Sequence, residues 1–219
     1  MNRSELETIF SKERLHNFFL YFPGNERKSI FLYVANKQIS ESFYSSLAVL
    51  EISLRNAIHR ELSRRFKKPN WYETWQFDST LRPLWKDIDR ATGNIIVRGR
   101  KPTPGRIVAE LTFGFWTSLF NQRYEKVLWK QLRFAFPHLA KFQRQRKTIS
   151  APLNLVRKEV RNRIYHYEPI IWNLEELQNY HRTIYLLLDW MDPKISNWLT
   201  DFDRFPNVLV ETQNQLKIL

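Results

Sequence analysis

The sequence predicts an all-α fold, and three observations predict it. Only 5 of the 219 residues are glycine, and the alternation of apolar and polar residues that is typical of half-buried strands is scarce. Long stretches instead place apolar side chains three and four positions apart, which is the spacing of an amphipathic helix. Breaker residues such as proline and glycine separate these stretches. We therefore expect a bundle in which several short helices pack on two or three long ones.

The N-terminal part of the chain predicts two helices before the first long one. Ser11 is placed to cap a helix that ends before the breaker sequence Pro23-Gly24-Asn25. A short helix from about Arg27 to Lys37 follows.

The clearest helical pattern begins at Ser40 and ends near Lys67-Lys68-Pro69. Its apolar stripe comprises Phe43, Leu47, Leu50, Leu54, Ile58, Leu62 and Phe66. Another helix is expected from Ser79 to about Ile96, because Pro83 falls in its first turn, where proline is tolerated.

The segment Arg98 to Gly105 is basic and rich in breakers, and it predicts a loop. No change of composition marks a domain boundary, so we interpret residues 1–219 as a single domain and this loop as an insertion in it. The remaining helices are expected at Arg106 to Phe120, Tyr124 to Phe136, Thr148 to Tyr167, Leu174 to Met191 and after Pro193.

The chain is basic and contains no cysteine. Lys and Arg number 35 against 22 Asp and Glu, which gives a formal charge of +13. Such a charge favours a polyanionic partner, most often nucleic acid, although a basic protein without that partner would have the same composition. The lack of cysteine excludes disulfides, a thiol nucleophile and cysteine-based metal sites.

The composition also bears on location. Met1 to Leu15 carries charges throughout and resembles no apolar signal region. The longest apolar run, Ile184 to Met191, is far shorter than the roughly 20 residues that a membrane helix needs. We therefore expect a cytoplasmic protein that does not enter a membrane.

The motif RNRIYH, Arg161 to His166, is the leading candidate for a catalytic site. On a helical wheel, Asn162 and His166 share a polar face, with Lys158 beside them and Arg161 at its flank. This face points away from the apolar stripe of the helix, which comprises Ile149, Leu153, Val156, Val160, Ile164 and Tyr167. A polar helix face with these residue types is most often simply solvated, so the motif alone does not establish catalysis.

The end of this helix affects the chemistry of its histidine. Pro169 disfavours helical geometry at Glu168, so the helix should end near Tyr167 with His166 in its last turn. The negative end of the helix dipole favours the imidazolium form, while the charge of Arg161 opposes it. A histidine balanced in this way is suited to acid–base chemistry near neutral pH.

Four blocks of sequence extend the motif over most of the chain. They are SKERLHNFF near Ser11, FLYVANKQISESFYSSLAVLEISLRNAIHREL from Phe31 to Leu62, GRIVAELTFGFWTSLF from Gly105 to Phe120, and EVRNRIYHYEPI from Glu159 to Ile170. In this order they resemble the Abi-like (abortive-infection) proteins of the HEPN superfamily. HEPN ribonucleases carry Arg and His with four to six residues between them, commonly with Asn directly after the Arg. The resemblance implies a HEPN-type helical bundle with additional short helices, and an RNA substrate.

The chemistry of RNA cleavage needs few groups. RNA carries an internal nucleophile, its 2′-OH, so one group must take that proton, another must protonate the leaving 5′-oxygen, and a cation must stabilise the phosphorane. His166 suits the proton transfers, Arg161 suits the phosphate, and Asn162 can hold either partner. Neither a metal nor another cofactor is required. Because one motif supplies one histidine, the complete site is expected to combine two copies across a homodimer, as in HEPN relatives.

Supporting residues are expected on the long helix that starts at Ser40. Glu51 falls at the edge of its apolar stripe, and a carboxylate there needs a partner. Arg55, four residues on, is the local option; Arg161 is the functional option, which the resemblance favours. Arg55 and His59 echo the motif with a shorter spacing, and we interpret His59 as structural. Tyr165, within the motif, joins Lys158 as a supporting residue.

Two basic clusters are the best sequence candidates for phosphate contacts, although each could be a solvated surface. They comprise Arg98, Arg100, Lys101 and Arg106, and Arg144, Arg146 and Lys147.

The sequence and its resemblance to Abi-like proteins therefore favour a metal-independent endoribonuclease that acts as a toxin, a growth-arresting effector in phage defence. A separate antitoxin, protein or small RNA, is implied by that function. The alternatives are a non-catalytic RNA-binding protein of the same fold and a structural interaction module. Other catalytic classes lack their motifs: there is no G-x-S-x-G, Walker loop, G-x-G-x-x-G or H-x-x-x-H.

Overall fold

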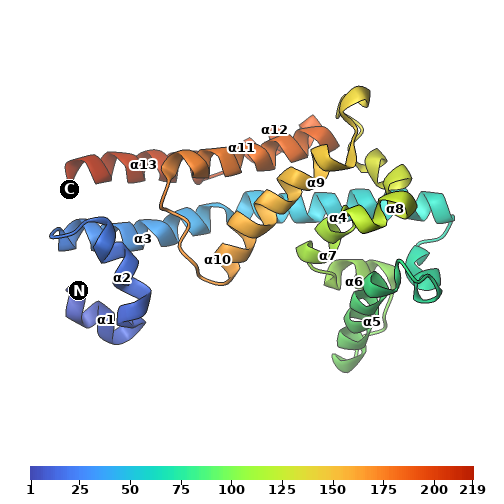
Figure 1. Cartoon of the computed structure of the whole chain (residues 1–219), viewed down its shortest axis with the longest axis horizontal. Helices are drawn as coiled ribbons and strands as arrows, with labels where there is room; N and C mark the ends of the chain where they lie inside the picture. The colour runs from blue at the N-terminus through green and yellow to red at the C-terminus, as the bar shows by residue number, and fades with distance from the viewer.

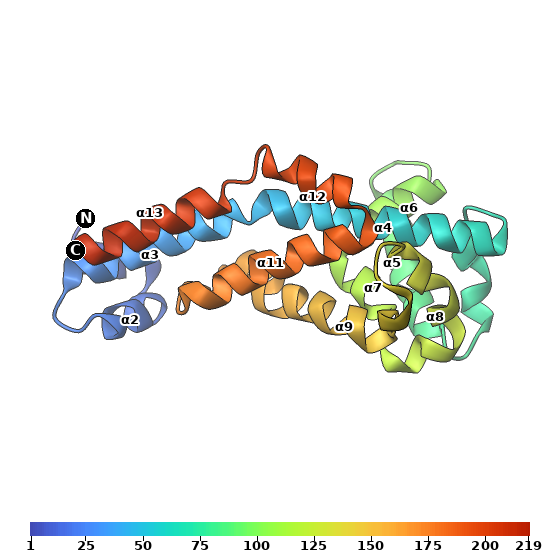
Figure 2. The same ribbon diagram turned by 90° about the horizontal axis from the view of Figure 1, so that it is seen from above.

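The computed structural model describes residues 1–219, and it contains helices and no strand. Helices α3 (Glu26–Ser42) and α4 (Tyr44–Phe66) follow one another as a long spine. Figure 1 and Figure 2 show α13 (Phe205–Ile218) lying along α3, and α11 (Leu174–Met191) lying along α4. The prediction of an all-α fold is confirmed.

The two spine helices are separated by a single residue, Phe43, which is fully buried. The prediction that Ser40 starts the long helix is wrong, because Ser40 lies inside α3 and its hydroxyl donates to the carbonyl of Asn36 at 2.7 Å. The apolar periodicity continues through the junction at Phe43. It therefore shows which face of the helices is buried, but not where one helix ends and the next begins. The helix expected at Arg27 to Lys37 is correspondingly longer.

The N-terminal region forms two short helices that pack beside α3. Helix α2 (Lys12–Tyr21) begins after Ser11, whose hydroxyl accepts the backbone N–H of Arg14, as predicted. Helix α1 (Arg3–Phe10) was not predicted from the sequence, although Asn2 and Glu5 form a capping box at its start.

The middle of the chain folds into a cluster of short helices at one end of the spine (Figure 1). Its elements are η1 (Trp71–Phe77), α5 (Arg82–Val97), α6 (Pro104–Glu110), α7 (Phe113–Ser118), η2 (Gln122–Tyr124), α8 (Glu125–Leu132) and η3 (Arg133–Ala135).

The single helix predicted from Arg106 to Phe120 is wrong. It is divided into α6 and α7 because Leu111 is extended and Thr112 caps the second helix, its hydroxyl accepting the N–H of Phe115 at 3.3 Å. The basic loop is also shorter than predicted, since Pro104 opens α6. Pro83 lies in the first turn of α5, as expected.

The motif lies in a continuous rod that follows η4 (Lys141–Gln143) and crosses the spine (Figure 1). The rod consists of α9 (Arg146–Leu155), the π-helix η5 (Val156–Asn162) and the short α10 (Arg163–Tyr165). After it, α11 leads into α12 (Pro193–Thr200) and α13. A π-helix has wider turns than an α-helix and is frequent at functional sites.

The π-helix changes the predicted apolar stripe. Val156 and Val160 are fully buried, as predicted, but Tyr167 lies beyond the helix and is 70% exposed. The assignment of Tyr167 to the stripe is therefore wrong, because a wheel with a constant α-helical step does not hold across a π-turn.

A contiguous cluster of buried apolar side chains runs through the molecule from Leu6 to Leu209. Its largest members include Trp71, Trp75 and Trp116, which anchor the short helices to the spine. No helix has both the length and the apolar character needed to cross a membrane.

Candidate active site

The helix that carries the motif ends one residue before His166, which caps it. The backbone N–H groups of Tyr167 and Glu168 donate to the carbonyls of Ile164 and Arg163, at 3.0 and 2.7 Å. This pattern is a Schellman motif, in which the residue after the cap has left-handed geometry and is usually glycine. Here that residue is Tyr167, with φ of 58°. His166 is thus exposed at a reversal of the chain with a defined geometry.

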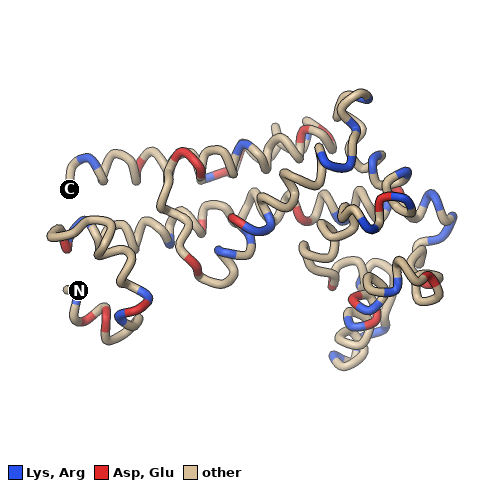
Figure 3. Tube along the Cα trace, in the orientation of Figure 1, with Lys and Arg blue, Asp and Glu red and all other residues tan.

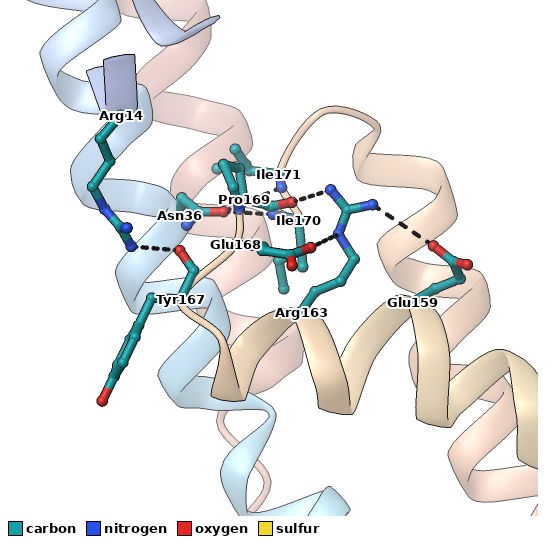
Figure 4. A network of polar contacts seen from close by, with 9 residues as sticks. All are labelled: Arg14, Asn36, Glu159, Arg163, Tyr167, Glu168, Pro169, Ile170 and Ile171. Atoms are coloured by element: carbon teal, nitrogen blue, oxygen red, sulfur yellow. Dashed lines mark hydrogen bonds and ion pairs between the residues drawn. The ribbon is translucent and has the colours of Figure 1, made fainter. Parts of the chain in front are cut away.

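The loop after His166 is held by side chains from two distant helices, as Figure 4 shows. Asn36 on α3 is 2% exposed, and its Oδ1 accepts the backbone N–H groups of Ile170 and Ile171 at 2.8 and 3.3 Å. Arg14 on α2 donates from Nη2 to the carbonyl oxygen of Tyr167 at 2.6 Å. These bonds fix the direction in which the chain leaves the motif.

Arg163 holds the same loop from the side of the motif helix. Its Nη2 donates to the carbonyl of Pro169 at 2.7 Å (Figure 4). The guanidinium also forms ion pairs with Glu159 at 3.7 Å and with Glu168 at 3.8 Å. The second arginine of the motif is therefore engaged within the chain, and it is a positioning residue for the loop.

Arg161, by contrast, makes no hydrogen bond within the chain. Its guanidinium carbon lies 4.3 Å from the centroid of the Tyr165 ring. Its Nε is buried without a hydrogen-bond partner. A half-buried guanidinium that is oriented by an aromatic ring and keeps its donors unused is suited to bind an anion.

Glu51 lies near this guanidinium from the α4 side. Burial raises the pKa of the Glu51 carboxyl, and the charges of Arg161 and Arg55 and the backbone N–H of Phe113 lower it by less, so the net shift is upward. Both partners that the sequence offered for Glu51 therefore act on it, and Arg161 has the larger effect. Glu51 and Arg161 form no ion pair, so the Arg161 guanidinium remains available to bind an anion.

His166 faces a pocket of about 400 Å³ that α2, α3 and the loop enclose. Two cations in this pocket, Arg14 and Lys37, were not found from the sequence. Burial lowers the pKa of Lys37, and the charge of Arg14 lowers it further. The amine lies 5.4 Å from the Tyr33 ring and 5.9 Å from the Tyr167 ring, and no carboxylate pairs with it. No hydrogen bond joins His166 to Arg161, so the chain presents the two motif residues as separate groups.

The second Arg–His pair has a structural environment. The indole N–H of Trp71 donates to Nδ1 of His59 at 2.9 Å, and burial lowers the pKa of His59. Arg55 donates to the carbonyl of Ala109 at 3.4 Å. His59 therefore supports the buried Trp71, in keeping with its interpretation as structural, whereas Arg55 lies beside Glu51.

The predicted phosphate-contacting residues divide into two groups. Several have intrachain partners: Arg98 pairs with Glu110 at 2.9 Å, Arg106 donates to the carbonyl of Lys101 at 2.8 Å, Arg144 binds the carbonyls of Pro137 and Leu139, and Arg146 pairs with Glu125 at 2.9 Å. The side chains of Arg100, Lys101 and Lys147 are exposed and have no such partner. Lys158 is likewise exposed, and Asn162 is half-buried.

The arrangement offers an exposed imidazole and several unused cations for work on an anionic substrate. His, Asp and Glu side chains do not gather in groups of three that could hold a metal ion. Comparison with protein-family models, curated proteins and solved structures finds no significant match.

Proposed function

We propose that this protein is a metal-independent endoribonuclease of the HEPN type. The observation that carries the proposal is the state of Arg161: its guanidinium is half-buried beside Glu51 and Tyr165, and it makes no hydrogen bond within the chain. An arginine held in this way has unused donors for a phosphate. The resemblance of the four sequence blocks to Abi-like proteins supports the same function and adds a role as growth-arresting effector in phage defence.

The reaction is a transesterification within the RNA. The 2′-oxygen attacks the adjacent phosphorus, and the bond from phosphorus to the 5′-oxygen of the next nucleotide breaks. The proton of the 2′-OH passes to a base, and an acid gives a proton to the departing 5′-oxygen. The products are a 2′,3′-cyclic phosphate and a 5′-OH.

The residues of the motif take distinct roles in this reaction. His166, exposed at the end of its helix, exchanges the protons. Arg161 stabilises the negative charge that grows on the non-bridging oxygens, which is the largest catalytic contribution in many enzymes. Asn162 and Lys158 hold the phosphate or the imidazole in place. A second copy of the chain supplies the second imidazole, and a separate antitoxin, protein or RNA, restrains the enzyme in the cytoplasm.

A non-catalytic RNA-binding protein of the same fold is the second candidate. The observation in its favour is the number of exposed cations without carboxylate partners, among them Arg100, Lys101 and Lys147. These residues serve binding equally well with or without cleavage. A purely structural interaction module leaves the formal charge of +13 without a role.

The test is incubation of the purified protein with total RNA in EDTA, followed by analysis of the new ends. We expect cleavage without added metal and 2′,3′-cyclic phosphate and 5′-OH ends. An RNA with a single 2′-deoxy nucleotide at the mapped site should not be cut there. Cleavage of that RNA, or a need for Mg²⁺ with 5′-phosphate products, would show that water is the nucleophile. Binding without cleavage supports the second candidate.

A further inference from the structure

A second groove lies away from His166, where the end of α4 meets η1 and α8. Its volume is about 560 Å³, which is within the usual range of ligand sites, about 300–1,000 Å³. The C-terminal end of α4 and helix α8 lie at the same end of the molecule, and Figure 3 shows many Lys and Arg residues there. None of the residues that line this groove belongs to the motif or to the basic clusters predicted from the sequence.

Three cations line the groove: Arg65 from α4, and Lys126 and Lys130 from α8. All three are exposed, and none forms an ion pair, whereas their neighbours Arg64 and Lys68 pair with Glu61 and Glu73. Unpaired cations that converge from two helices create a site for a polyanion.

One carboxylate, Asp78, lines the groove together with the three cations. Its Oδ1 accepts the backbone N–H groups of Thr80 and Leu81 at 2.8 and 3.0 Å, so it is held by the backbone and forms no ion pair with them. Three positive charges against one negative charge leave the groove with a net positive charge.

Aromatic rings line the same groove as the cations. Phe77, the last residue of η1, is 85% exposed, and Phe66, the last residue of α4, is 38% exposed. Trp75 also lines the groove, and its indole N–H is buried without a hydrogen-bond partner. The Phe77 ring, at 85% exposure, is hardly packed against the core, so its face is free to stack on a flat ligand.

We propose that this groove binds a single strand of RNA, with bases stacked on Phe77 and Phe66 and phosphates held by Arg65, Lys126 and Lys130. Sites for single-stranded nucleic acid combine these two features, cations for the backbone and aromatic faces for unpaired bases. A duplex hides the faces of its bases, and an acidic peptide uses the cations alone. The inference rests on the proposed function only for the identity of the polymer, because binding here is separate from cleavage.

The experiment measures binding of a single-stranded 2′-O-methyl RNA, which lacks the reactive 2′-OH, by fluorescence anisotropy at several salt concentrations. Phe77→Ala should weaken binding at least about fivefold, and Phe77→Trp should restore it, since a stacked base contributes through the aromatic face. The triple variant Arg65→Gln, Lys126→Gln, Lys130→Gln should lower the slope of log K against log salt by about 2, at about 0.7 per phosphate contact.

Matched controls lie outside the groove, on helices that do not line it. Trp198 is 59% exposed on α12, and Lys217 is exposed on α13, so Trp198→Ala and Lys217→Gln should bind RNA as the wild type does. Thermal unfolding of each variant checks the fold, which the removal of surface side chains should leave intact. A duplex of the same length should bind more weakly and show no dependence on Phe77.

The outcomes separate this inference from the proposed chemistry. If the protein cleaves RNA but the groove variants bind and cleave like the wild type, the groove proposal is wrong and the ribonuclease stands. If only the cation variants weaken binding, the groove is a general anion patch and the proposal is also wrong. If Phe77→Ala and the triple variant weaken binding in a protein that never cleaves RNA, the groove is supported and the ribonuclease is not.

Discussion

Asn36 and Ile170 are joined by a hydrogen bond of 2.8 Å, although 134 positions separate them in the sequence. The Asn36 side chain is buried in α3, and it accepts a second backbone N–H from Ile171. One side chain thus binds two backbone groups of the loop that follows His166, which Arg14 and Arg163 also hold. The position of the proposed catalytic histidine depends on a helix on the opposite side of that loop.

Asn36→Ala should therefore destabilise the protein and impair the site together. It leaves two buried N–H groups without an acceptor, and each unsatisfied group costs about 1–3 kcal/mol. We expect the free energy of urea unfolding to fall by about 2–6 kcal/mol, at about 1–3 kcal/mol for each of the two groups. RNA cleavage per folded molecule should also fall, because the loop after His166 loses a contact that holds it. Asn197→Ala, which removes an exposed asparagine from α12, is the control and should change stability by less than about 0.5 kcal/mol. A stable Asn36→Ala protein would mean that the contacts of Arg14 and Arg163 are enough to hold the loop.

Tyr167 provides a test of the backbone at the site. Its left-handed φ of 58° costs a non-glycine residue about 1–2 kcal/mol. Tyr167→Gly should therefore keep or raise stability despite the loss of the contact with Lys37, whereas Tyr167→Val should lower stability by about 1–2 kcal/mol because β-branching disfavours this conformation. The readout is the midpoint of thermal unfolding. Tyr44→Val, at an exposed position at the start of α4, controls for the chemistry of the exchange. Equal loss at both positions would contradict the backbone argument.

The raised pKa of Glu51 predicts a pH dependence of stability. Its folded-state pKa lies above the unfolded value of 4.5, mainly because of burial. At pH values between these two pKa values, the folded state binds more protons than the unfolded state. The contribution of Glu51 to the unfolding free energy therefore falls as the pH rises through this range. Glu51→Gln cannot lose a proton and should not show this fall. The difference in unfolding free energy between Glu51→Gln and the wild type should therefore favour the variant more at pH 7.5 than at pH 4.

The same variant should lose activity, because a neutral amide no longer orients the Arg161 guanidinium by charge. Urea unfolding at the two pH values and RNA cleavage at pH 7.5 give the two readouts. Glu211→Gln, at an exposed position on α13, controls for the loss of one negative charge. A Glu51→Gln protein with wild-type cleavage would remove Glu51 from the site.

The two histidines of the Arg–His pairs should respond in opposite ways. His166→Ala should reduce cleavage by about 10²- to 10⁴-fold, which is the usual contribution of a general acid or base, with little change in stability. His59→Ala deprives the buried Trp71 indole of its acceptor and should cost about 1–3 kcal/mol, with cleavage per folded molecule retained. Cleavage and urea unfolding are measured on both variants. Equal loss of cleavage from both, with both folded, would mean that two motifs contribute.

Local signals in the sequence predict a helix well when both of its ends carry a cap. Helix α11 has the predicted bounds because Asn173 accepts the N–H groups of Glu175 and Glu176 at its start, and the extended Asp192 precedes Pro193 at its end. Where the apolar pattern continues through a junction, as at Phe43, periodicity gives the face of the helix but not its boundary. The π-helix has no sequence signature of this kind, so the wheel fails beyond it.

The residues of the candidate site were predictable from the sequence where a local pattern places them. The inward placement of Glu51 follows from the pattern of its own helix, and the motif is contiguous in the sequence. Arg14 and Lys37 could not be found in this way, because their places near His166 depend on how α2 and α3 pack against a loop some 130 or more positions away. The partners of Arg144 and Arg146 are also tertiary, so a run of charges could not distinguish structural arginines from free ones.

The proposed reaction needs a second imidazole from another copy of the chain. His166 is the only histidine in its pocket, and the reaction needs both a base and an acid, so the proposed site is complete only when two chains meet. We expect a two-fold homodimer in light scattering, and activity per chain that falls on dilution below the dimer dissociation constant.

Mixing wild type with His166→Ala gives the sharper test. If each site needs an imidazole from both chains, activity after exchange should follow the square of the wild-type fraction; a self-sufficient chain gives a linear dependence. In mixtures of wild type with His59→Ala, activity should instead change linearly with the wild-type fraction, because His59 is not part of the proposed site. A strict monomer that cleaves RNA, or a linear dependence in the His166→Ala mixture, would show that one chain carries out both proton transfers.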